Sequence, residues 1–135
     1  MIKIFLLSGI LLISGCHLEK SYISPLGVAI QDNAPCFFVP PEIVKSLRLA
    51  ENRGIYVSRK TAQHWVFFWD SPQQSILPGI VAGECLSYPQ IKWQEGIYSV
   101  LMGASSDNDS ERYRLEKTFN LQKDNQGNFL IREAP

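Results

Sequence analysis

The sequence lacks an excess of charge of either sign. Its 13 Lys and Arg residues equal its 13 Asp and Glu residues, and it has two histidines. Proteins that bind nucleic acid or an anionic membrane surface through charge usually carry a clear basic excess. The balanced charge argues against both classes, and a length of 135 residues favours one small domain.

The sequence also lacks the short motifs of common catalytic mechanisms. It contains no G-x-S-x-G elbow, P-loop, G-x-G-x-x-G, H-E-x-x-H or S-x-x-K. Residues 107–111 are similar to the start of a calcium loop, but Arg112 stands where that loop needs glycine and Thr118 where it needs glutamate. We therefore expect a protein that is not an enzyme and binds no cofactor or metal ion.

Long hydrophobic runs are absent apart from one at the start of the chain. Residues 4–13 are apolar except for Ser8 and Gly9, and they follow Lys3. A helix of this length rises about 15 Å, roughly half of the hydrocarbon core of a bilayer. A basic residue, a short apolar run and small residues after it are typical of a secretory signal peptide. The sequence therefore predicts a signal peptide over residues 1–15.

The end of this segment, Leu12-Ile13-Ser14-Gly15-Cys16, resembles the bacterial lipobox, in which the cysteine is lipidated and becomes the mature N-terminus. Several acyl chains, each contributing about 0.8 kcal/mol per buried CH₂, anchor a protein stably to a membrane. The resemblance implies a palmitate-type lipid on Cys16. Residues 17–25 are polar with little pattern and end at Pro25, so we expect a tether over residues 16–25 and a single β-domain over residues 26–135. His17 stands where an aspartate favours inner-membrane retention, so we expect attachment to the periplasmic side of the outer membrane.

Two cysteines remain once Cys16 is assigned to lipid, and they are Cys36 and Cys85. Disulfides form and persist in the oxidising compartment that the signal peptide predicts. A catalytic thiol would need a base, and His64 is the one histidine in the expected domain; a zinc site would need four ligands at suitable spacing. We therefore expect a Cys36–Cys85 disulfide.

Short runs rich in β-branched and aromatic residues recur along the expected domain, with turn residues between them. In 112–122, apolar and polar side chains alternate except at Lys117, as in a sheet with one solvent-facing side. Residues 123–127 predict a hairpin loop, and Pro40-Pro41-Glu42 predicts the start of a short helix. The expected strands are Leu26–Gln31, Cys36–Val39, Gly54–Lys60, Gln63–Trp69, Cys85–Trp93, Gly96–Gly103, Arg112–Gln122 and Asn128–Arg132.

Trp65-Val66-Phe67-Phe68-Trp69 is apolar at every position. It predicts either a central strand covered on both faces or a strand with one exposed aromatic side. Large apolar side chains that are exposed together usually mark an interaction surface. Trp65, Phe67 or Trp69 would become contact candidates if they faced solvent.

The loop of residues 105–111 is acidic and lies between two expected strands. All-β scaffolds often present binding surfaces on such loops, although a solvated hairpin tip has the same composition. We take Asp107, Asp109 and Glu111 as the candidate partner-binding residues.

These patterns together predict an all-β domain, an antiparallel β-sandwich with one disulfide. The order of cysteine, tryptophan and cysteine along the chain is similar to that in immunoglobulin domains, with Cys36 first, Trp65 or Trp69 next and Cys85 last. However, no tyrosine stands two residues before Cys85, and further strands follow it. An immunoglobulin-like arrangement and a small β-barrel stay open as alternatives.

Four segments carry a resemblance to a known family: the lipobox, Ala34-Pro35-Cys36-Phe37-Phe38-Val39-Pro40, Gly83-Glu84-Cys85-Leu86-Ser87-Tyr88 and Gly96-Ile97-Tyr98-Ser99-Val100. They resemble small bacterial lipoproteins described as type VI secretion system immunity proteins. The resemblance implies a lipid-anchored protein facing the periplasm, whose partner is a cognate protein toxin that it binds and neutralises. A rigid domain suits this task because a preorganised surface loses little entropy on binding.

Two other functions fit the same sequence. An envelope structural or assembly lipoprotein would need a permanent partner and a large apolar patch. A lysozyme-type enzyme inhibitor would block its target in the same way, although the short inhibitory motifs expected of that class are not evident.

Overall fold

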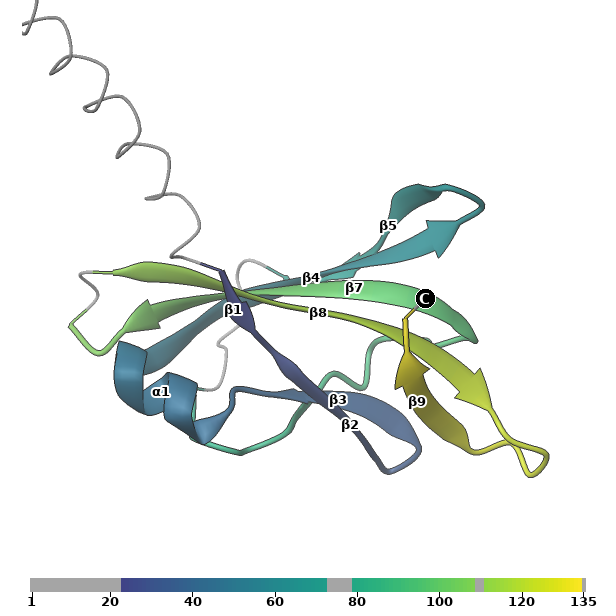
Figure 1. Cartoon of the computed structure of the whole chain (residues 1–135), viewed down its shortest axis with the longest axis horizontal. Coiled ribbons are helices and arrows are strands. Elements are labelled where there is room, and N and C mark those ends of the chain that lie inside the picture. The colour runs from purple at the N-terminus through teal and green to yellow at the C-terminus, as the bar shows by residue number, and fades with distance from the viewer. Residues whose placement is uncertain (1–22, 73–78, 109–110, 135) are drawn as a thin grey trace, which may run out of the picture.

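The structure is a computed structural model that describes residues 23–72, 79–108 and 111–134. The described part is mostly β-structure with one short helix (Figure 1). The helix α1 spans Pro41–Leu47, and the strands are β1 Ile23–Pro25, β2 Gly27–Gln31, β3 Ala34–Phe38, β4 Leu49–Thr61, β5 His64–Asp70, β6 Leu86–Ser87, β7 Gly96–Ser106, β8 Arg112–Lys123 and β9 Phe129–Glu133.

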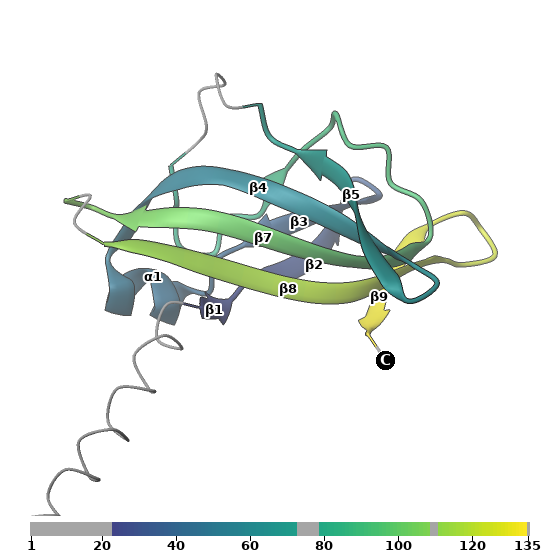
Figure 2. The same cartoon turned by 90° about the horizontal axis from the view of Figure 1, so that it is seen from above.

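The described strands form two sheets. The long sheet has the order β1-β8-β7-β4-β5, and β9 also pairs with β8. β1 runs parallel to Arg114–Glu116 of β8, and β9 runs antiparallel to Phe119–Lys123 of the same strand. The small sheet has the order β2-β3-β6 and lies on one side of the long sheet (Figures 1 and 2). This arrangement confirms the expected antiparallel β-sandwich.

The core forms between the two sheets because every second residue of the long strands is apolar. Tyr98 pairs with Phe119 and Met102 with Leu115, and all four side chains are fully buried. Phe37 of the small sheet packs against this layer, with its ring centroid 6.1 Å from that of Phe119. Burial of such side chains, each worth about 1.5 to 3 kcal/mol, holds the two layers together.

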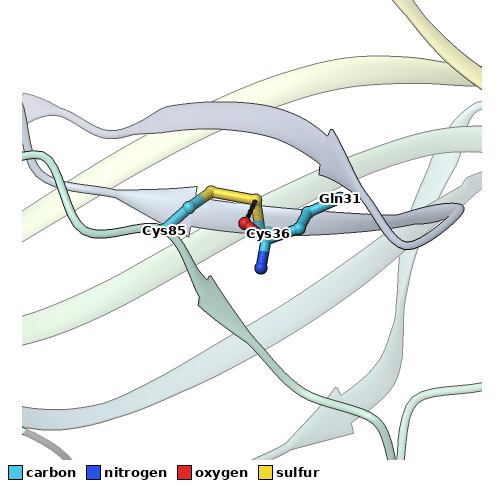
Figure 3. The surroundings of a disulfide bond; sticks show 3 residues. All are labelled: Gln31, Cys36 and Cys85. Atoms are coloured by element: carbon cyan, nitrogen blue, oxygen red, sulfur yellow. Dashed lines mark hydrogen bonds between the residues drawn. A yellow bond between two sulfur atoms is a disulfide. The ribbon is translucent and has the colours of Figure 1, made fainter.

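The disulfide between Cys36 and Cys85 is present and joins residues 49 positions apart, as the sequence predicts (Figure 3). Cys36 lies on β3 and Cys85 directly precedes β6, which pairs with β3. Gln31 Oε1 lies 3.9 Å from Cys36 Sγ, a van der Waals contact because a disulfide sulfur has no proton to donate. The bridge therefore fixes the third strand of the small sheet.

The two finer alternatives for the fold are not observed. The immunoglobulin disulfide joins the two sheets, whereas here both cysteines belong to the region of the small sheet. Among the described residues, the long sheet does not close on itself, since β5 is its terminal strand. The fold is thus a sandwich of a long and a small sheet.

The expected strand Cys85–Trp93 is wrong over most of its length. Only Leu86–Ser87 are extended and paired, because Pro89 follows and the Ile91 N–H donates to the Tyr88 carbonyl in a turn. Tyr88, Ile91 and Trp93 nevertheless pack into or against the core. Their apolar character reflects burial in an irregular segment and not a strand.

Two boundaries also differ from expectation. Ile23–Pro25, which the sequence predicts as part of the tether, form β1 and pair with β8. The expected helix is confirmed over Pro41–Leu47 with a proline in its first turn, and it ends at Arg48 in a left-handed conformation (φ 55°). The chain then enters β4, which starts at Leu49 and is longer than expected.

Candidate functional site

β5 is an edge strand with an exposed aromatic side. It pairs with β4 and ends the long sheet among the described strands. Trp65 and Phe67 are 47% and 57% exposed, whereas Phe68 and Trp69 pack against the core. The expectation of a central strand covered on both faces is therefore wrong, and the alternative with an exposed aromatic side is confirmed.

A β-bulge decides which aromatic side chains of β5 face outward. Val57 pairs with Trp69 but Ser58 pairs with Phe67, so Phe68 is the extra residue. Phe68 contacts Tyr98 at a centroid distance of 5.1 Å, and Trp69 contacts Tyr88 at 5.8 Å. Two consecutive side chains of β5 thus enter the core, and strict alternation resumes toward His64.

The outward side chains gather on the face of the long sheet opposite the small sheet. Tyr56 of β4 is 44% exposed, and its ring lies 5.4 Å from that of Phe67. The register places Tyr56, Phe67 and Trp65 on one side of the β4–β5 hairpin. We call these three residues the aromatic face. Figure 2 views the long sheet from this side, and Figure 1 shows the hairpin projecting away from the small sheet.

A shallow depression continues the aromatic face along β4 and β7. It is lined by Arg53, Gly54, Ile55, Tyr56, Asp70, Ser71, Leu101 and Gly103. A Cβ at Gly103 would lie 3.5 Å from the Cβ of Arg53, and Arg53 forms an ion pair with Glu51 at 3.3 Å. Aromatic side chains beside a depression are typical of surfaces that bind protein partners.

The β4–β5 hairpin carries two cations near its turn. Residues 58–67 include Arg59 and Lys60 and no carboxylate, whereas Asp70 pairs with Tyr56 at the far end of β5. Arg59 donates to Gln94 Oε1 at 2.9 Å and to the Glu95 carbonyl at 2.6 Å, both neutral acceptors. Its charge and that of Lys60 are therefore not compensated by an ion pair among the described residues.

Asp107 and Glu111, two of the three candidate residues of the acidic loop, lie in the connection between the end of β7 and the start of β8. Asp107 Oδ2 forms an ion pair with Arg48 Nη2 at 3.1 Å, and its N–H donates to the Arg48 carbonyl. The Glu111 N–H donates to Ser106 Oγ at 3.1 Å. The loop is thus tied to the end of α1 and does not adjoin the aromatic face. Asp109 and Cys16 lie outside the described residues.

The described residues hold no grouping that suggests metal binding. They contain no group of three or more His, Cys, Asp and Glu side chains placed to hold a metal ion. The helix that the structure describes is too short and too polar to span a membrane. The clear pKa shifts belong to structural groups: burial raises the pKa of Tyr88 and Tyr98, and backbone N–H donors from Asn128 and Gln126 lower the pKa of Asp124.

Tyr56 is the member of the aromatic face that sequence reasoning missed. It belongs to an expected strand in which Ile55 and Val57 are the buried residues. The alternation around it predicts a solvent-facing tyrosine, which is a signal for an interaction surface only when neighbouring strands add further aromatic residues. That condition depends on the pairing of β4 with β5.

Comparisons with known proteins found no match to this chain. No protein-family model matches the chain, no curated protein matches its sequence, and no solved structure matches its fold.

Proposed function

We propose that this chain is a lipid-anchored immunity protein, which faces the periplasm and neutralises a toxic effector by binding it through the aromatic face. The observation that carries the binding function is the joint exposure of Tyr56, Trp65 and Phe67 on one side of an edge hairpin. Aromatic residues on a rigid scaffold are the side chains that most often dominate protein–protein binding energy.

The sequence supports the place and class of this function. The signal peptide and the lipobox at Cys16 support export and membrane anchoring, and the Cys36–Cys85 bridge fits an oxidising compartment. The resemblance to type VI secretion system immunity lipoproteins supports a toxin as the partner. In this proposal the protein is not an enzyme, since blocking a toxin needs only tight binding.

The experiment is co-expression of the full chain with the product of the adjacent gene, directed to the periplasm. The neighbour's product should stop growth when expressed alone, and the wild-type chain should restore growth. The double variant W65S/F67S should fail to restore it while accumulating to the same level. Val81→Ser is the matched control, because Val81 is 56% exposed but lies outside the aromatic face.

Two outcomes would contradict the proposal. Full protection by W65S/F67S would show that the aromatic face does not bind the toxin. Asp107, Asp109 and Glu111 would then be the next candidates for the binding site. A harmless neighbour, together with stable envelope components bound to the chain, would favour an envelope structural lipoprotein, which an exposed apolar patch also fits.

A further inference from the structure

We propose that the outward edge of β5 binds its protein partner by strand addition, taking up an extended acidic segment of that partner beside Trp65 and Phe67. This inference deepens the proposed function and rests on it for the identity of the partner protein. It concerns the mode of binding and the chemistry of the bound segment.

The register of the β4–β5 hairpin decides which backbone groups of β5 point away from β4. Ala62 and Gln63 form a two-residue loop, flanked by the pair Thr61 and His64. In such a hairpin the flanking pair is hydrogen-bonded, and the pairs alternate from there. Trp65 and Phe67 are then in non-hydrogen-bonded pairs, so their N–H and C=O groups point away from β4.

Among the described strands, this edge of the long sheet has no further partner, whereas the opposite edge is covered. The far side of β8 is occupied by β1 and β9, whereas β5 has one partner, β4, among the described strands. Edge strands are usually protected by charge, proline or a bulge. Residues 65–67 have neither charge nor proline, and the bulge at Phe68 lies beyond them.

A strand added to this edge would meet apolar side chains of β5. Trp65 and Phe67 stand on the outer face and Val66, which is 43% exposed, on the other. A strand added at the usual spacing of about 4.8 Å would therefore find apolar contacts on both of its faces. This favours a segment whose apolar residues contact the hairpin on either side.

The charge near the turn of the hairpin selects an acidic occupant. Arg59 and Lys60 lie on β4, roughly 10 Å from the added strand, which is about one Debye length at physiological ionic strength. Asp70 pairs with Tyr56 at the far end of β5, and no carboxylate lies within residues 58–67 of the hairpin. A second copy of this chain would bring the same positive hairpin alongside, whereas an acidic segment is attracted.

The test uses the full chain purified in detergent and a short synthetic peptide of central valines, whose side chains face both sides of an extended strand, flanked by glutamates. Nuclear magnetic resonance then follows amide hydrogen exchange at single residues. With the peptide, exchange at the Trp65 and Phe67 amides should slow several-fold, and exchange at Val66, whose N–H faces β4, should not change. A peptide in which lysine replaces glutamate should give no protection.

A pair of variants separates the backbone from the side chain. Phe67→Pro removes the outward N–H, which proline tolerates at a strand edge, and Phe67→Leu keeps it. The peptide should protect Trp65 in F67L and fail to do so in F67P, with both proteins showing the wild-type melting temperature. If F67P does not fold, the exchange pattern of the wild-type chain decides alone.

Three outcomes would overturn the inference. Absence of protection at Trp65 and Phe67 excludes strand addition, and equal protection by the lysine peptide excludes the acidic partner. A sedimenting dimer that F67P dissociates would assign the edge to a second copy. Failure of the proposed function can be told apart from failure of this inference. A harmless neighbouring gene product would contradict the proposed function and leave the peptide result unchanged. A neutralised toxin without amide protection would refute strand addition alone.

Discussion

A single buried hydrogen bond links β4 to the irregular segment after β6. Asn52 Nδ2 donates to Tyr88 Oη at 3.3 Å, and Asn52 Oδ1 accepts from the Gly54 N–H at 2.9 Å. Both side chains are at least nine-tenths buried. Because water cannot replace a lost partner there, the amide group of Asn52 depends on the tyrosine hydroxyl.

We therefore expect Tyr88→Phe to lower the free energy of unfolding by about 1–3 kcal/mol, the usual cost of leaving a buried donor without a partner. Urea denaturation measures this change. Tyr56→Phe is the matched control, since Tyr56 is 44% exposed, and it should change stability by less than about 0.5 kcal/mol. Equal effects of the two variants would contradict the role of the Asn52 contact.

Burial of two tyrosines makes stability depend on pH in the alkaline range. Burial raises the pKa of Tyr88 and Tyr98 above their ordinary 10.0, more than the hydrogen bonds to Asn52 and the Gln94 backbone lower it. A pKa that is higher in the folded state favours the neutral phenol in that state. This contribution is fully present below pH 10.0 and is lost as the pH rises through the folded-state pKa values.

Chemical denaturation at a series of alkaline pH values should thus show the free energy of unfolding falling above pH 10.0. The double variant Y88F/Y98F should fall less steeply than the wild type over the same range. Parallel curves would show that these phenols do not cause the loss.

At the scale of elements, two hairpin turns are joined by one asparagine. The β2–β3 turn places Asp32 and Asn33 in left-handed conformations, with φ of 53° and 56°. Asn33 Oδ1 accepts from the Phe129 N–H at 2.7 Å, and Asn33 Nδ2 donates to the Gly127 carbonyl at 3.4 Å. The end of the small sheet is thereby attached to the β8–β9 hairpin.

Glycine adopts the left-handed conformation at either turn position without strain, so a pair of substitutions isolates this attachment. Asn33→Gly should be less stable than Asp32→Gly by about 1 kcal/mol, because it alone removes the two hydrogen bonds to β9 and its turn. Thermal unfolding of the two variants measures the difference. No difference between them would mean that the turns are held together by other contacts.

At the scale of the whole molecule, the disulfide acts on the unfolded chain as well as on the small sheet. Cys36 is 1% exposed and its Cα lies 5.3 Å from that of Cys85. Closing a loop of 49 positions removes conformational entropy of the denatured state worth about 4 kcal/mol. For a small domain this is a large fraction of the total free energy of unfolding.

The variant C36A/C85A should therefore lose about 4 kcal/mol of unfolding free energy, measured by guanidinium denaturation of protein made in an oxidising compartment. Reducing agent should lower the wild type to the stability of the variant and leave the variant unchanged. A stable wild type after complete reduction would contradict the loop-entropy argument.

The sequence by itself determined the fold class and much of the strand plan. Alternation in Arg112–Gln122 marks a half-buried strand because successive side chains of any strand face opposite sides, whatever its neighbours are. With Cys16 assigned to lipid and the domain predicted to be exported, two cysteines leave one intramolecular pairing, so predicting the Cys36–Cys85 bridge needed no knowledge of the fold. Local chemistry also sufficed for the short helix after Pro40, since proline suits a first turn.

Only the tertiary structure decided where the candidate site lies. Residues 65–69 are apolar throughout, so their pattern carries no information about which side faces solvent. The edge position of β5 and the bulge opposite Val57 and Ser58 turn Phe68 and Trp69 inward and leave Trp65 and Phe67 outside. Strand order and bulges arise from contacts between segments distant in the sequence, and local composition does not encode them.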